Sequence, residues 1–167
     1  MPVQLTLDEI RAVTAYAVVC AEPALELARD DPRARAAVDT ARVFATGAAR
    51  TKALRDVAFA AHRAAREAPD AAAREAARAA GHAAGAAYLH PLATATQVGH
   101  VLGAAAHAAL AFELAGHDGD HLERCRDLAT PLVVDVLRRY PPAPPGYGRA
   151  GELMRALDAA LRGGIPP

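Results

Sequence analysis

Tryptophan is absent from this sequence, and aromatic residues make up only 4% of it. The aromatic and β-branched residues that favour strands are scarce, so we expect no substantial sheet. Most of the 53% hydrophobic share is alanine, the best helix former, and arginine, leucine and glutamate follow it in helix propensity. The composition therefore predicts an all-α protein whose core is built from small side chains.

The sequence also lacks the features of secreted, membrane-spanning and nucleic-acid-binding proteins. Only two cysteines occur, and no N-terminal stretch has the sections of a signal peptide, so we expect a reduced, cytoplasmic protein. His100, His107 and Glu113 interrupt the longest apolar run, which falls short of the roughly 18 residues of a membrane span. The formal net charge is zero, which argues against a nucleic-acid partner.

Charge is nevertheless distributed unevenly along the chain. Residues 1–31 contain six acidic and two basic residues, whereas residues 32–80 contain ten basic and five acidic residues. A solvated helix face with ion pairs three or four residues apart explains most such patterns. The functional alternative is an acidic protein partner that docks on the middle helices. The candidate contacts for it are four arginines, Arg63, Arg66, Arg74 and Arg78.

Helix start and stop signals in the first half predict four helices. The segment Thr6 to Glu9 has the form of a capping box, and Asp31-Pro32 combines an N-cap with proline at the first helical position. Gly47 is a stop signal for the second helix. A third helix is expected over 48–68, because Pro69-Asp70 ends it and caps the next one.

In the second half we expect a long helix over 93–115, closed by Gly116, and another over 121–140 despite Pro131. The chain is then expected to form one compact, single-domain bundle of about six to seven helices. Its predicted parts are a helical core at 1–140, a Pro/Gly-rich linker at 141–149, a C-terminal helix packed on the core at 150–162 and a disordered tail at 163–167.

A short motif occurs twice. Residues 81–87 and 99–105 share the form Gly-His-x-x-Gly-Ala-Ala. Glycine inside a helix costs about 1 kcal/mol relative to alanine, so four glycines at matched positions must serve packing or function. We interpret them as the close crossing of two helices, with a shared ligand site as the alternative.

Histidines are the chemical groups expected on the apolar helix faces. Two of them lie seven residues apart on one helix, and a third can meet them across the glycine crossing. Such a cluster can bind metal, relay protons or sense pH, although a core histidine bonded to its neighbours is the more common arrangement. The candidate ligand-binding residues of a pocket between the two Gly-His helices are His62, His82, Tyr88, His100 and His107.

The sequence gives little support for metal binding or catalysis. His117, His121 and Cys125 have helical spacing, but a structural zinc site also needs ligands from a second element, so we expect no metal. The nucleophile elbow Gly-x-Ser-x-Gly and the Walker loop are absent. We therefore assign no catalytic residue and no cofactor, and we expect a binding protein more than an enzyme.

Three segments resemble the Imm-5-like family of bacterial immunity proteins. They are 58–67, 80–92 and 95–108, and the resemblance extends from about Leu7 to Gly116. Its distinctive parts are Leu-His-Pro-Leu at 89–92 and Thr-Gln-Val-Gly-His-Val-Leu-Gly at 96–103, because alanine-rich composition does not produce them. The resemblance implies a small all-helical fold and neutralisation of a cognate protein toxin by binding.

Two functional hypotheses follow. The first is a non-enzymatic immunity protein that docks on its toxin through charged helical faces. The second is a small-molecule-binding protein or minor enzyme with the histidine-lined pocket. The sequence also leaves open whether the chain forms a homo-oligomer. The apolar helix over 93–115 is the surface expected to contact a second copy.

Overall fold

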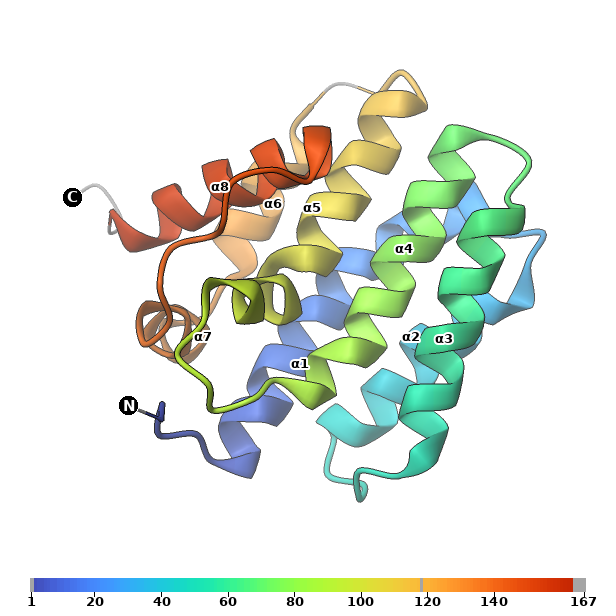
Figure 1. Cartoon of the computed structure of the whole chain (residues 1–167). Helices are drawn as coiled ribbons and strands as arrows, with labels where there is room; N and C mark the ends of the chain where they lie inside the picture. The colour runs from blue at the N-terminus through green and yellow to red at the C-terminus, as the bar shows by residue number, and fades with distance from the viewer. Residues whose placement is uncertain (1, 118, 164–167) are drawn as a thin grey trace.

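The computed structural model describes residues 2–117 and 119–163. Within them the chain forms eight α-helices and three short 3-10 helices (Figure 1). These are α1 (Leu7–Ala21), η1 (Glu22–Ala28), α2 (Pro32–Ala45), α3 (Lys52–Glu67), α4 (Ala71–Gly85), η2 (Ala86–Tyr88), η3 (Ala95–Gln97), α5 (Val98–Leu114), α6 (His121–Leu128), α7 (Pro131–Arg138) and α8 (Gly148–Arg162). The described residues contain no strand, so the all-α prediction is confirmed, with one α-helix more than the expected number.

The predicted helix starts are confirmed by their side-chain caps. Thr6 Oγ1 accepts from the Glu9 amide at 3.2 Å, and Glu9 Oε2 accepts from the Thr6 amide at 2.8 Å, which completes the capping box of α1. Asp31 and Asp70 accept from backbone amides at the starts of α2 and α4. These local polar contacts satisfy amides that a helix start otherwise leaves without partners.

The prediction of one helix over 121–140 was wrong. α6 ends at Leu128, and Pro131 opens a separate helix, α7, whose N-cap Thr130 accepts from the Val133 amide at 3.3 Å. Proline disfavours the helical conformation at the preceding residue and has no amide hydrogen to continue the ladder. The same ring is well suited to the first position of a new helix.

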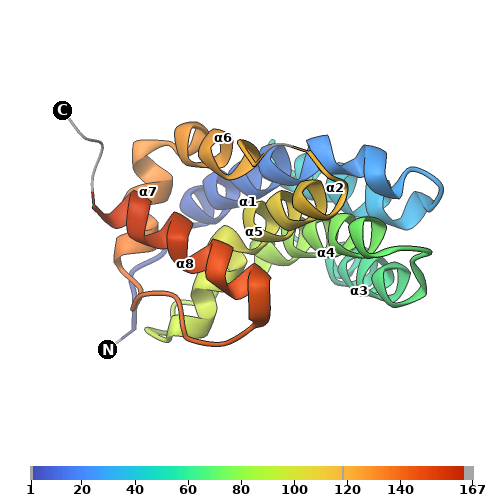
Figure 2. The same ribbon diagram turned by 90° about the horizontal axis from the view of Figure 1, so that it is seen from above.

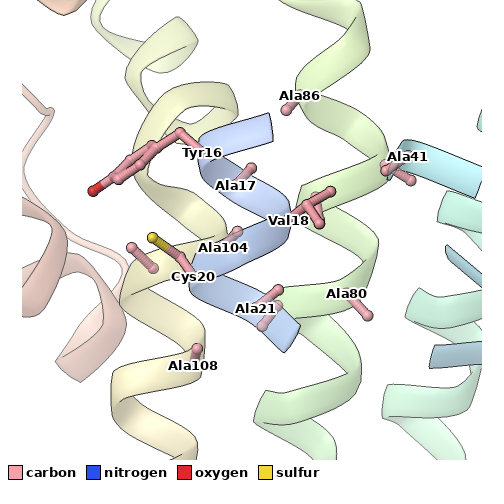
Figure 3. Packing of buried hydrophobic residues seen from close by; sticks show 14 of the residues in the cluster. Tyr16, Ala17, Val18, Cys20, Ala21, Ala41, Ala80, Ala86, Ala104 and Ala108 are labelled. Carbon is pink, nitrogen blue, oxygen red and sulfur yellow. The ribbon is translucent and has the colours of Figure 1, made fainter. Parts of the chain in front are cut away.

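α4 lies between α3 and α5, and α1 and α2 also pack on it (Figures 1 and 2). Its buried positions are largely alanines. Figure 3 shows α1 between α4 and α5, with Val18 on the side of α4 and Tyr16 and Cys20 on the opposite side. Small side chains such as Ala17 and Ala104 fill this region, so neighbouring helices lie close together.

α5 packs against α1, α4, α6 and α8, and its apolar residues are buried on nearly all sides. The helix that we expected to offer a surface to a second copy is therefore covered by the chain itself. None of the helices in the described part of the chain has the length and apolarity needed to cross a membrane.

The segment after Tyr140 is held against the bundle by apolar contacts of α8 and by hydrogen bonds. Leu153, Leu157 and Leu161 are buried against the core. Asp158 is also buried, and it accepts from the Ala143 amide at 2.9 Å and from Arg162 Nε at 2.7 Å. The linker is therefore held in place by hydrogen bonds. Of the tail that we expected to be disordered, residues 164–167 lie outside the described residues.

Candidate functional site

A buried carboxylate lies at the centre of the candidate site. Glu75 on α4 is only 2% exposed, and both of its oxygens are engaged. Oε1 accepts from Arg78 Nη1 at 2.7 Å and from Arg74 Nε at 3.2 Å, while Oε2 lies 2.7 Å from His107 Nδ1. Burial opposes the charge, but the hydrogen bond from His107 and the two guanidinium groups outweigh it and lower the pKa of Glu75 to about 2.

Three imidazole rings, one each from α3, α4 and α5, lie in a row beside this carboxylate. His82 on α4 stacks on His107 of α5, with ring centroids 4.7 Å apart, and His62 of α3 meets His82 edge-on at 5.4 Å. Burial, followed by the neighbouring histidine charges, lowers the pKa of His82 well below its ordinary value. Burial also lowers the pKa of His62, so both rings favour the neutral form.

Two of the four repeated glycines, Gly81 and Gly103, make room for these rings. A β-carbon on Gly103 would lie 2.5 Å from His82 Nδ1, and one on Gly81 would lie 2.7 Å from His62 Nε2. Each of these glycines therefore faces a histidine of the neighbouring helix. The two other glycines of the repeat, Gly85 and Gly99, face open space. α4 and α5 contact each other extensively, which fits the close crossing that the repeat predicted.

Next to Glu75 and His107 is a cavity of about 580 Å³. Its walls come from α4, from the α5 region and from the segment that leads into α8. The lining residues are Glu75, Arg78 and His82; Thr96, Gly99, His107 and Leu110; and Pro144, Tyr147, Gly148, Arg149, Ala150, Gly151 and Met154. This volume lies within the usual range of small-molecule sites.

The third wall depends on an unusual loop. Gly146, Tyr147 and Gly148 have φ angles of +90°, +62° and +57°, a run of left-handed residues that ends at the first residue of α8. A β-carbon on Gly151 would overlap the carbonyl oxygen of Gly146, so the loop folds back closely on the first turn of the helix. Arg155 Nη1 fixes it by donating to the carbonyls of Pro144 and Gly146.

Sequence reasoning missed this loop and Glu75. Residues 146–151 have the form Gly-x-Gly-x-x-Gly, a signal for a tight turn into a helix, yet we treated them only as part of a linker. Glu75 gave no comparable signal, because an acidic residue beside two arginines is typical of an exposed ion pair. Its partner His107 is 32 residues away.

The five predicted pocket residues do not all meet. His82 and His107 line the cavity, and His62 touches His82 from outside the lining. The Nδ1 of His100 instead pairs with the Gly85 carbonyl at 2.8 Å. Tyr88 lies in a separate pocket, where its ring faces the guanidinium groups of Arg50 and Arg55.

The four predicted partner-binding arginines divide into two pairs. Arg74 and Arg78 on α4 are half-buried and engage Glu75. Arg63 and Arg66 on α3 are exposed and form no salt bridge with any described residue. Together with Arg55 and Phe59 they form one stripe, which we name the α3 face: Arg55, Phe59, Arg63 and Arg66.

Of the three residues with zinc-like spacing, His121 and Cys125 are buried, whereas His117 is exposed. His121 Nε2 lies 2.9 Å from the Cys20 carbonyl and 3.5 Å from Cys125 Sγ, while His117 packs on Phe112. Both cysteines are free and buried. No group of three or more potential ligands is arranged to hold a metal ion within residues 2–117 and 119–163.

Comparison with known proteins identifies the family. A family model described as "Imm-5 like putative immunity protein" matches residues 4–130, which include α1 to α6. No curated protein and no solved structure matches the chain. Because the match covers well over half of the 167 residues, this chain belongs to the Imm-5-like family of immunity proteins.

Proposed function

We propose that this protein neutralises a protein toxin by binding it through the α3 face, without catalysis. Membership of an immunity-protein family supports a protein partner. The observation that carries the choice of surface is Phe59, an aromatic side chain that is 58% exposed among arginines. A cytoplasmic encounter stays a prediction, and the two free cysteines are consistent with it.

The α3 face has the chemistry of a docking surface for an acidic partner. Arg55, Arg63 and Arg66 form no salt bridge within the described chain, whereas Lys52 at the start of the same helix pairs with Asp56 at 2.8 Å. Arginine and aromatic residues are enriched at interface hot spots, and unpaired positive charge speeds association with a negatively charged surface. Because Arg74 and Arg78 are engaged by Glu75, the proposal depends chiefly on Arg63 and Arg66.

The test couples capture with rescue of growth. The tagged protein is used to capture partners from its native lysate, and each captured protein is then expressed alone in a heterologous host. A partner that arrests growth alone, and no longer does so when the wild-type protein is co-expressed, is the toxin. The Phe59→Asp single variant and the Arg63→Glu, Arg66→Glu double variant are expected to lose this protection.

Arg35→Glu is the matched control, because Arg35 is also exposed and forms no salt bridge with a described residue, but it lies on α2. It is expected to protect as well as the wild type does. Equal protection by all variants would overturn the assignment to the α3 face. Absence of any captured protein that both arrests growth and is neutralised would overturn the immunity function itself.

A further inference from the structure

The cavity beside Glu75 has two chemically different sides. Glu75, Arg78 and His107 form a polar side, and Leu110 and Met154 form an apolar one. Leu110 and Met154 also pack on the small hydrophobic cluster under α8. Pockets that combine an apolar surface with a few convergent polar groups are typical of small-molecule sites.

Positive and negative charges are unevenly placed around the polar side. Arg74 and Arg78 share the single carboxylate of Glu75, so one positive charge is not balanced there. Arg149, at the rim, pairs with two carboxylates, Glu113 and Glu152, so the rim has one negative charge in excess. The local positive excess reaches the cavity through Arg78, which lines its wall and favours an anion at that point.

Hydrogen-bond donors remain available on this side. Only one nitrogen of Arg78 is engaged, and His107 uses Nδ1 for Glu75, which leaves Nε2. Among the described residues, Arg11 Nε is the only buried side-chain nitrogen or oxygen without a partner. The unengaged nitrogens of Arg78 and His107 are therefore accessible and not sealed in the interior.

We propose that this cavity binds a small organic anion, with its oxyanion against Arg78 and His107 and its apolar body against Leu110 and Met154. A planar guanidinium is well suited to a carboxylate or a phosphate, and charge-assisted hydrogen bonds are about twice as strong as neutral ones. The backbone amides of Gly148 and Arg149 have no acceptor in the described chain and lie in the same wall, where they add further donors.

This site is separate from the α3 face. None of Arg55, Phe59, Arg63 and Arg66 lines the cavity. Part of its wall, including Tyr147 and Met154, lies beyond residue 130, where the family match ends. The anion site and toxin binding therefore depend on different residues, and either can fail without the other.

The test is an NMR titration that follows the ring signals of His82 and His107 and the methyl signal of Met154. The probes are hexanoate, hexyl phosphate, acetate and hexylammonium. Hexanoate or hexyl phosphate is expected to shift all three signals, and the tighter of the two identifies the head group. Acetate should bind at least about tenfold more weakly, because it has no apolar body to bury. Hexylammonium should not bind.

Two variants make the test specific. Tyr147 is 73% exposed with φ +62°, a conformation that aspartate tolerates, so Tyr147→Asp places negative charge at the rim with little cost to folding. Arg78→Gln removes the guanidinium that faces the proposed oxyanion. Each should weaken anion binding by about tenfold or more. Phe59→Asp, a matched aromatic-to-aspartate change on the α3 face, should leave it unchanged.

Three results would overturn the proposal. They are an absence of shifts with both hexyl anions up to roughly 10 mM, equal affinity for hexylammonium, or unchanged affinity in Tyr147→Asp. Because Tyr147→Asp retains the packing around Glu75, the test stays decisive even where Arg78→Gln does not fold.

Discussion

The imidazole of His82 occupies the space that a β-carbon on Gly103 would need, since such a carbon would lie 2.5 Å from Nδ1. His82 is held on its other sides by His107 and His62. The ring therefore has little freedom to move aside, and glycine is required on α5 at this point.

Gly103→Ala is accordingly expected to destabilise the fold by about 1–3 kcal/mol, the usual cost of overpacking a core. Gly85→Ala is the matched control, because a β-carbon there meets nothing within 4 Å. Alanine at that position should be neutral or stabilising. Urea unfolding of the two variants measures the difference, and equal stability would contradict the packing role of Gly103.

Glu75→Gln should destabilise the protein by about 3 kcal/mol at pH 7, the free energy that corresponds to lowering the pKa from 4.5 to about 2. Because the folded-state pKa is depressed, the stabilisation is present above pH 4.5 and is lost as the pH falls toward 2. The side chain is 3% exposed, so solvent screening is small.

Urea unfolding between pH 7 and pH 2 tests this expectation. Glu9, whose pKa is also lowered to about 2 by the hydrogen bond that it accepts from Arg139, contributes in the same range. The difference between the wild type and Glu75→Gln isolates the share of Glu75. Asp56→Asn, which removes an exposed ion pair with Lys52, should cost less than about 1 kcal/mol. Parallel curves for the wild type and Glu75→Gln would refute the prediction.

His82 should make the protein less stable in mild acid. Its folded-state pKa lies below its value in the unfolded chain because the ring is buried, so protonation favours unfolding. Above pH 6.5 the ring is neutral in both the folded and the unfolded chain and costs no stability. Below pH 6.5 the free energy of unfolding falls by about 1.4 kcal/mol per pH unit until the folded ring titrates.

His82→Gln should flatten this part of the stability curve between pH 7.5 and pH 5. The comparison is needed because His121 has a raised pKa and acts in the opposite direction. In the wild type, the ring signals of His82 should keep their neutral positions at pH 6. A shift with a midpoint near 6.5 would show that the ring is not desolvated as described.

The two thiols should be unreactive in the folded protein. Hydrogen bonds from Cys20 and His121 lower the pKa of Cys125, which favours the reactive thiolate, but both cysteines are 0% exposed. Burial should dominate, so that a disulfide reagent modifies them only as fast as the chain unfolds. Reaction traces with and without urea check this, and rapid modification of the native protein would contradict it.

The helix boundaries show which features the sequence can predict. Thr6, Asp31 and Asp70 cap their helices through contacts with residues two or three positions away, so the local sequence contains all the information. The boundary at Pro131 was harder to predict, because a proline ring is compatible with either a kink or a helix start. The capping side chain of Thr130 decides for a start.

The site was predicted only in part, because its contacts join residues from different helices and depend on how those helices pack. His100 and His107 share a face by spacing, yet His100 reaches the carbonyl of Gly85 while His107 reaches Glu75. Which of these partners each ring meets depends on how α5 crosses α4. The wall that contains Tyr147 was not predictable, since a proline-rich segment has no periodicity to show where it returns to the bundle.

The alanine-rich interior has a consequence for how this chain responds to mutation. Alanine has no side-chain torsion, so residues such as Ala17, Ala80 and Ala104 lose no rotamer entropy on folding. For the same reason they cannot absorb an added methyl group by changing rotamer. The strain passes to the backbone, and one enlarged side chain between α1, α4 and α5 should translate a whole helix where a leucine-rich core would repack locally.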